Sequence, residues 1–236
     1  MRPGMVLLKH YITYDEQARC EIDHNKVGII RSCQKLGLGP GGFYQLGNHG
    51  HYIMALGLTW DPKRRMYELW RTVDGTKTHD IPEDYSLLVK RSIQDAHAHL
   101  KKDLKVTNLE VEDVLPSMSP TVCIVNFYTT LATLALHQLT CLGRSESKGS
   151  LQNGLPIVSF SLGDSAEFIY VDVHKVKKVI LESGDVLMFG GKSRHIHHGV
   201  SSIIPNSAPK QFLEESRLRP GRLNLTFREF QKLFNV

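Results

Sequence analysis

The segment RLNLTFREF, residues 222–230, carries polar side chains with a period of two. Alternate residues of a strand share a face, so Arg222, Asn224, Thr226 and Arg228 point one way and the apolar residues between them point the other. A guanidinium group binds a carboxylate through a two-pronged pair of hydrogen bonds. This face therefore suits a small dianion, although an exposed polar sheet face would show the same pattern.

Two further segments offer side chains for a binding site. In VNFYTTLATLALH, Asn126 and Tyr128 share a face of one strand and could meet the same ligand, and the segment ends at His137. In HIHH, residues 195–198, three of four positions are histidine. Histidine is a frequent metal ligand, but a lone histidine in a strand is more often structural. The cluster favours a metal site without indicating which of its histidines binds.

The elements that position these residues change in character near residue 120. From there on, short apolar segments alternate with Gly, Asp and Asn turns, which is typical of a β-sandwich or jelly roll. We expect strands in seven segments: TVCIVNFY, PIVSFSLG, AEFIYVDV, KKVILES, DVLMFGG, HIHHGV and LNLTFREF. Ser159 and Ser161 alternate with Val158, Phe160 and Leu162, as in a half-buried strand.

The first 120 residues have a different pattern. Residues 15–36 read as a helix that is interrupted near Asp23–Asn25 and stops at Gly37, and residues 81–103 read as a second helix. The second begins at a proline, carries acids early and lysines late, and spaces its leucines and isoleucine helically. YIMALGLTW reads as a strand and DPKRRMYELW as a hairpin.

Composition limits the function classes. The chain has 236 residues, 41% of them hydrophobic, a formal charge of +5 and four cysteines without a CxxC pair. The cysteine spacing argues against a zinc ribbon or a disulfide framework and favours a reducing compartment. No apolar segment approaches a membrane span, and no signal-peptide cleavage site is evident. The mild positive charge is compatible with a nucleic-acid partner but also with an ordinary solvated surface.

In order and spacing these motifs resemble one family. Asn126-x-Tyr128, His137, SGDVLMFGGKSRHIHHG and GRLNLTFREF are similar to AlkB-type 2-oxoglutarate and Fe(II)-dependent dioxygenases, with the homologue-one-like branch of plants nearest. The resemblance implies a mainly β fold with α-helices. It consists of a double-stranded β-helix (jelly roll) core at 121–236 and an N-terminal helical and hairpin nucleotide-recognition extension at 1–120.

The resemblance also implies roles for individual residues. His137 and His198 would bind Fe(II). Arg222, Asn224 and Tyr128 would hold the distal carboxylate of 2-oxoglutarate, and Arg228 with Asn126 its proximal end. Trp60 and Tyr67 match positions that line the nucleotide-binding side, while ordinary hairpin packing explains them equally well.

One departure concerns the metal. The family pattern is His-x-Asp, but here HQ is followed by LTCLG and RSES, so position 139 is leucine. Leucine supplies no ligand atom, whereas Fe(II) in this family needs two imidazoles and one carboxylate. Glu146 is an alternative third ligand if the loop folds back, and Cys141 is a weaker candidate because its sulfur is soft.

Two functions follow as expectations. The first is oxidative demethylation of N-alkylated bases in DNA or RNA, with a flipped or single-stranded base in an aromatic pocket. The alternative is a catalytically impaired AlkB-like chain that still binds nucleic acid or 2-oxoglutarate. We expect a monomer with no membrane partner. We also expect it to reside in the nucleus or cytoplasm, or in an organelle if a further N-terminal segment exists.

Overall fold

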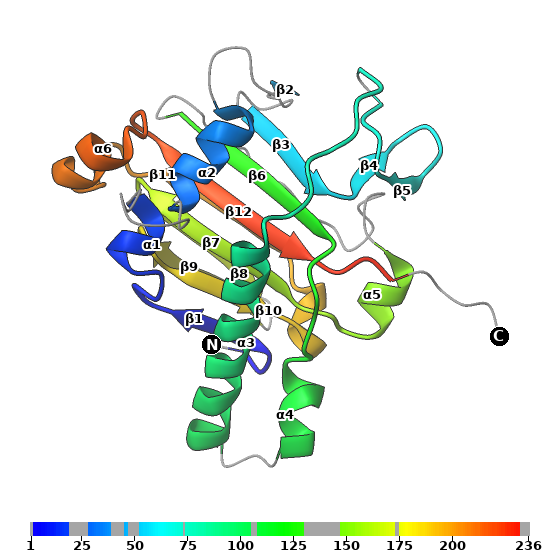
Figure 1. The fold of residues 1–236 in the computed structure, drawn as a ribbon. Helices are drawn as coiled ribbons and strands as arrows, with labels where there is room; N and C mark the ends of the chain where they lie inside the picture. Colours follow the sequence, from blue (N-terminus) through cyan, green and yellow to red (C-terminus); the bar gives the residue numbers. More distant parts are fainter. Residues whose placement is uncertain are drawn as a thin grey trace.

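A computed structural model describes residues 2–18, 28–38, 45–46, 52–72, 74–104, 108–129, 147–172 and 175–231. Two antiparallel sheets, a small hairpin and several helices make up these residues (Figure 1). None of the helices in the described ranges is both long enough and apolar enough to cross a membrane.

The larger sheet has seven strands in the order β1-β10-β7-β12-β6-β3-β2, and every pairing in it is antiparallel. Strand β12, near the middle, pairs with β6 on one side and with β7 on the other. The strands are β1 (Met5–Leu8), β2 (Gln45–Leu46), β3 (Tyr52–Gly57), β6 (Val122–Tyr128), β7 (Ile157–Gly163), β10 (Val186–Phe189) and β12 (Arg222–Arg228).

The smaller sheet has the order β11-β8-β9, with β8 (Ala166–Asp172), β9 (Lys175–Leu181) and β11 (His198–Ile203). Phe168 and Tyr170 of β8 pack against Ile157 of β7 and Phe189 of β10 in one buried cluster. The two sheets therefore face each other across an interior. This arrangement confirms the predicted mainly β fold with α-helices and a jelly-roll core.

The other face of the large sheet is covered by helix α3 (Glu83–Leu104), which runs across it in Figure 1. The predicted helix at 81–103 is thus confirmed, with Glu83 and Asp84 in its first turn and lysines in its last. Tyr85, Val89 and Ile93 face the sheet and are buried. Leu87, which the helical spacing also suggested for the buried side, is 56% exposed.

The remaining elements are short. They are α1 (Tyr14–Ala18), α2 (Ile29–Cys33), the π-helix η1 (Gln34–Leu38), β4 (Thr59–Asp61), β5 (Met66–Glu68), α4 (Asn108–Val114), α5 (Lys148–Gln152), the 3₁₀ helix η2 (Gly191–His195) and α6 (Lys210–Ser216). Helix α4 is tied to α3 by a 2.6 Å hydrogen bond between His97 Nε2 and the Leu115 carbonyl.

The helix predicted at 15–36 is helical at both of its ends, as α1 and as α2–η1, while the predicted interruption or fraying at Asp23–Asn25 lies outside the described residues. Helical geometry ends at Gly37, as predicted, because its φ is +131°. The strand predicted from residue 195 begins only at His198, because the preceding residues form η2. Residues Met5–Leu8, for which no strand was expected, form strand β1, which pairs with β10.

The predicted division at residue 120 does not separate two sheets. Strands β1, β2 and β3 come from the first 120 residues and are paired into the same sheet as β6, β7, β10 and β12. The roles assigned to the two parts of the chain stay a prediction.

Phe227 packs between the large sheet and helix α3, so its truncation measures how much this packing contributes to the free energy of unfolding. It is fully buried, with its ring 4.8 Å from Phe160 of β7 and 6.2 Å from Tyr85 of α3. We expect Phe227→Ala to lower the free energy of unfolding by about 3–5 kcal/mol, since it leaves a cavity between sheet and helix. Chemical denaturation measures this. Val176→Ala, at a position 61% exposed, should change it by less than about 0.5 kcal/mol.

Candidate active site

The polar face predicted for β12 faces the interior between the two sheets. Arg222 lies directly opposite Tyr128 of β6, and Asn224 lies between Asn126 of β6 and Ser161 of β7. Residues that pair directly across strands share a face. The alternate residues Leu223, Leu225 and Phe227 are fully buried on the other face, in the cluster that includes α3. The register thus brings all five predicted 2-oxoglutarate residues onto one face: Asn126, Tyr128, Arg222, Asn224 and Arg228.

Arg222 has the environment of a receptor for an anion. Its side chain is only 2% exposed, and its Nη2 donates a 3.0 Å hydrogen bond to Ser161 Oγ. Its Nε is buried without a hydrogen-bond partner, and no acidic residue of the described chain forms an ion pair with it. Burying a cation without a counter-charge is costly, so a carboxylate from a ligand would offset that cost.

The electrostatics at this end of β12 are consistent with that assignment. Burial lowers the pKa of Arg222, while the neighbouring Tyr128 acts in the opposite direction. Burial also raises the pKa of Tyr128, and the guanidinium lies 5.8 Å from the centre of its ring. Tyr128 therefore keeps its phenolic proton at neutral pH and can donate it in a hydrogen bond.

Asn224 and Arg228 extend the polar row along β12. The Asn224 amide donates to Ser159 Oγ at 2.7 Å and to the Phe160 carbonyl at 2.9 Å, and its oxygen accepts from Thr226 at 3.0 Å. Asn224 is thus held firmly within the sheet. Arg228 is 8% exposed and lies at the far end of the same strand. Six residues of strand separate the two arginines by roughly 20 Å at their Cα atoms, so both long side chains must extend toward the middle of the strand to meet the two ends of one small ligand.

His198 is oriented as a metal ligand would be. It is the first residue of β11, opposite Tyr170, and its ring lies 4.4 Å from that of Phe189. Its Nδ1 is 3.0 Å from the Ile196 carbonyl. A proton on Nδ1 that is donated to a carbonyl leaves the lone pair on Nε2, which is how metal-bound histidines are fixed in orientation.

The other residues predicted as metal ligands, which are His137, Glu146 and Cys141, lie outside the described part of the chain, as does Leu139. Their assignments stay predictions.

One cluster of potential metal ligands does occur among the described residues. Ligand atoms of His10, Glu182 and Asp185 lie within 4.8 Å of one another. However, the Lys9 ammonium lies 2.6 Å from Glu182 and 2.5 Å from Asp185, so a cation of the protein already pairs with both carboxylates and offsets part of their charge. We therefore assign this cluster a structural role, that of tying the end of β1 to the β9–β10 turn.

Trp60 and Tyr67, the predicted substrate residues, are cross-strand neighbours on the β4–β5 hairpin, with ring centres 5.4 Å apart. Only Trp60 of the two lines a pocket in the described part of the chain. Trp60 lines a pocket of about 340 Å³ that also includes Ile53 of β3, the strand partner of Asn126. Tyr67 packs behind Trp60 against Phe230, at 4.8 Å. The pocket thus borders β3, the strand next to the polar row of β6, and Trp60 forms part of its wall.

Sequence reasoning did not identify several residues of this region. Arg71, Thr72, Thr78 and His79 also line the pocket. They follow the hairpin in a segment without periodic patterning, so no local signal marked them. Ser161 was noted only for its alternation, yet it is the partner of Arg222.

Comparison with known proteins places this arrangement in a family. Residues 4–228 match the model of the 2OG-Fe(II) oxygenase superfamily. The alpha-ketoglutarate-dependent dioxygenase AlkB of Escherichia coli is 33% identical over 202 residues, with 80% of this chain and 78% of that protein covered. The chain belongs to the AlkB family of 2OG-Fe(II) oxygenases. The resemblance inferred from its motifs is therefore confirmed at the level of the family.

Plant members of the AlkB family are more similar still. The DNA N(6)-methyladenine demethylase ALKBH1D of Arabidopsis thaliana is 49% identical over 238 residues, covering 98% of this chain and 50% of that protein. ALKBH1C of the same plant is 44% identical, with 98% and 49% covered. The solved structure of OsALKBH1 has a TM-score of 0.79 at 50% identity, with 97% of this chain and 99% of that one covered. The chain spans about half the length of these Arabidopsis relatives.

Membership of the AlkB family implies Fe(II) and 2-oxoglutarate as cofactors. The described residues fit 2-oxoglutarate and supply one ligand for the metal. Arg222 offers a buried guanidinium whose Nε lacks a partner and can bind a carboxylate of 2-oxoglutarate. His198 offers an imidazole already oriented by the Ile196 carbonyl, which is one of the ligands that Fe(II) needs.

Removing the Arg222 guanidinium should weaken 2-oxoglutarate binding. We expect Arg222→Gln to cost about 2 kcal/mol or more of binding free energy, because the ligand carboxylate loses its charged partner. The affinity of Arg222→Lys for 2-oxoglutarate should lie between those of Arg222→Gln and the original chain, because lysine keeps the positive charge but cannot form the two-pronged pair of hydrogen bonds. Calorimetric titration with Mn(II) in place of Fe(II) measures binding without turnover. Arg64→Gln, whose side chain is 70% exposed, removes the same charge and should leave the affinity unchanged.

Proposed function

We propose that this chain uses Fe(II), 2-oxoglutarate and dioxygen to demethylate N-alkylated bases in nucleic acid. The observation that carries the proposal is the buried Arg222, which lies on the interior face of β12 without an acidic partner among the described residues. An arginine in that position is suited to bind an anionic cosubstrate. Family membership indicates which cosubstrate it is.

The residue roles are proposed as follows. Arg222 and Tyr128 receive the distal carboxylate of 2-oxoglutarate. Asn224, which was predicted for the same role, instead holds the strand, because its amide nitrogen already donates to Ser159 and to the Phe160 carbonyl. Arg228 and Asn126 receive the proximal end. His198 and His137 bind Fe(II). Their support is the shared face of β12 and β6 and the orientation of the His198 ring.

Fe(II) and 2-oxoglutarate, when bound, supply the oxidation: dioxygen converts 2-oxoglutarate to succinate and carbon dioxide and an N-methyl group to a hydroxymethyl group, which leaves as formaldehyde. The protein's own residues orient the reactants and limit access of water. Trp60 offers a ring face for the methylated base in a pocket of about 340 Å³. Because that pocket borders β3, the strand next to the polar row of β6, a base within it would present its methyl group toward the metal side.

N6-methyladenine in DNA is the first substrate to test. Two Arabidopsis relatives that are 49% and 44% identical carry the name DNA N(6)-methyladenine demethylase. A more distant relative in Schizosaccharomyces pombe, 26% identical over 265 residues, is named tRNA demethylase abh1. The substrate series should therefore include RNA.

The wider context follows from a nucleic-acid substrate. We infer that the hairpin region within residues 1–120 recognises the nucleotide and that residues 121–236 carry the chemistry. We further infer a monomer that meets its substrate in the nucleus or cytoplasm.

Leu139 favours a second candidate function, that of a catalytically impaired chain. We infer that the His-x-Asp motif of the AlkB family is disrupted here, with residues 139–143 standing in place of the aspartate. Loss of the carboxylate lowers metal affinity and loosens the geometry at the metal, and misplacement on the order of 1 Å can cost about 10²-fold in rate. The interior arginines are unaffected, so binding of 2-oxoglutarate and nucleic acid would outlast catalysis.

Restoring the motif should therefore restore the rate. We expect replacement of residues 139–143 by a single aspartate to raise formaldehyde release by about 10²-fold. The assay uses a single-stranded oligonucleotide with one N6-methyladenine and saturating Fe(II). Leu139→Asp alone should raise formaldehyde release by less, because the other residues that replace the motif, 140–143, stay in the chain.

Two controls complete the assay. Arg222→Gln in the restored chain should abolish the gain, which links the activity to this site. Full turnover by the unmodified chain, lost on Glu146→Ala, would contradict the impaired candidate and make Glu146 the third ligand. If neither the unmodified nor the restored chain releases formaldehyde from any methylated DNA or RNA, the proposed demethylation is wrong.

A further inference from the structure

Trp70 is exposed to an unusual degree for a tryptophan. Its side chain is 58% exposed, and it is one of only two tryptophans in the chain. Met66 and Leu69 on the same segment are each 42% exposed. A group of large apolar side chains in contact with water commonly marks a binding surface.

The segment that carries Trp70 is held in place by its own hydrogen bonds. We call residues 69–78 the Trp70 arm. After β5 the chain doubles back, so that Trp70 forms a β-bridge with Lys77. The Thr78 amide donates to the Leu69 carbonyl and the Arg71 amide to the Thr76 carbonyl, both at 2.8 Å. The Trp70 ring is therefore presented from a defined backbone, which lowers the entropy lost on binding.

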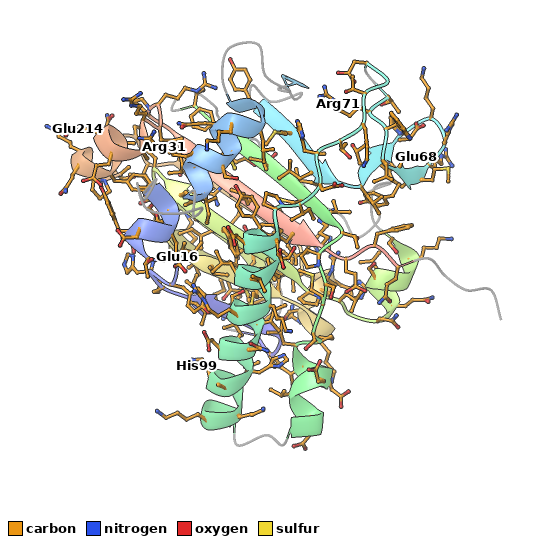
Figure 2. All side chains as sticks on the ribbon, in the orientation of Figure 1. Glu16, Arg31, Glu68, Arg71, His99 and Glu214 are labelled. Atoms are coloured by element: carbon orange, nitrogen blue, oxygen red, sulfur yellow. The ribbon has the colours of Figure 1, made fainter. Side chains whose placement is uncertain are left out.

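The Trp70 arm is continuous with the pocket that contains Trp60. Arg71, Thr72 and Thr78 of the arm all line it. Trp70 itself is 58% exposed and is not among the residues that line the pocket, so its ring lies outside the pocket, next to Arg71 in the chain. Figure 2 shows Arg71 and Glu68 on the lobe formed by the hairpin and this arm. A base inside the pocket would have its chain neighbour near Trp70.

Charge on this lobe favours a nucleic acid over an apolar protein partner. Lys77, opposite Trp70, is 51% exposed and lies 3.9 Å from Asp80. Lys63 and Arg65 in the β4–β5 turn are exposed and form no ion pair with any described residue. Exposed aromatic rings interleaved with cations are the features that single-stranded nucleic-acid surfaces use.

We propose that Trp70 stacks on the nucleobase adjacent to the methylated base, with Lys77 against the phosphate backbone. This inference rests on the proposed function, because it takes the base in the Trp60 pocket as its starting point. Trp70 thereby selects substrates in which the neighbouring base has an exposed ring face, as it has in a single strand or beside the gap that a flipped base leaves.

The test measures binding without turnover. The probe is a fluorescently labelled nine-nucleotide single strand with a central N6-methyladenine, together with versions that lack the base on its 5′ or 3′ side. Anisotropy titrations with Mn(II) in place of Fe(II) give the affinities. Trp70→Ala should weaken binding of the intact strand on the order of 10- to 100-fold, and Trp70→Phe by less. Leu87→Ala, at an apolar position 56% exposed on α3, is the matched control and should change nothing.

Stacking predicts a specific coupling between Trp70 and the neighbouring base. Removing that base should weaken binding by the original chain but should not weaken Trp70→Ala further. A direct readout compares the tryptophan emission of the original chain with that of Trp70→Phe, in which Trp60 is the one tryptophan left in the chain. At saturating strand, the original chain should show additional quenching with the intact strand, and this addition should be absent with the strand that lacks the neighbour.

Four other outcomes would contradict the proposed stacking of Trp70. If the original chain binds the strand and Trp70→Ala binds equally well, the inference is wrong and the proposed function stands. Equal weakening for intact and abasic strands would also overturn stacking. If sedimentation shows a dimer that Trp70→Ala dissociates without any change in strand affinity, the arm is a protein interface instead. If the original chain binds no strand at all, the proposed function fails first and the inference fails with it.

Discussion

The two-faced character of β12 is the constraint on which the rest of the structure depends. Leu223, Leu225 and Phe227 are fully buried against the layer that contains α3. The residues between them are polar, and Arg222, Asn224 and Arg228 are 8% exposed or less. A strand that is buried on both faces but polar on one requires partners for every polar group on that face. The neighbouring strands and the ligands of the family must supply them.

Strand β7 meets part of this requirement. Ser159 and Ser161 accept hydrogen bonds from Asn224 and Arg222, and the Phe160 carbonyl accepts a second bond from Asn224. These contacts fix the rotamers of the site before any ligand arrives, which reduces the ordering that binding must bring about. The Nε of Arg222 remains without a partner in the described part of the chain. The sheet therefore orients the site and leaves Arg222 to be completed by an anion.

The lobe at the edge of the sheet has a different physical basis. The β4–β5 hairpin is a separate two-stranded sheet and the Trp70 arm forms only an isolated bridge, whereas β12 is paired along its length on both sides. Short ribbons of this kind have little intrinsic stability and depend on side-chain anchors. The stacked rings of Trp60, Tyr67 and Phe230 are such an anchor. The sandwich thus carries the residues proposed to bind the cosubstrate, and a lobe anchored by aromatic contacts carries the residues proposed to bind the substrate.

The sequence by itself determined which residues of β12 share a face and which residues form helix α3. It also determined that the chain belongs to the AlkB family. Strand alternation and helix spacing are local properties, and the order of the motifs can be read without coordinates. Only the tertiary structure decided that β1 joins β10, that Ser161 meets Arg222, and that Trp60 lines the pocket while Tyr67 packs behind it. It also brought Arg71 to the wall beside Trp60. These outcomes depend on which strands pair and in what register, and pairing is set by burial across the whole sheet rather than by any single segment.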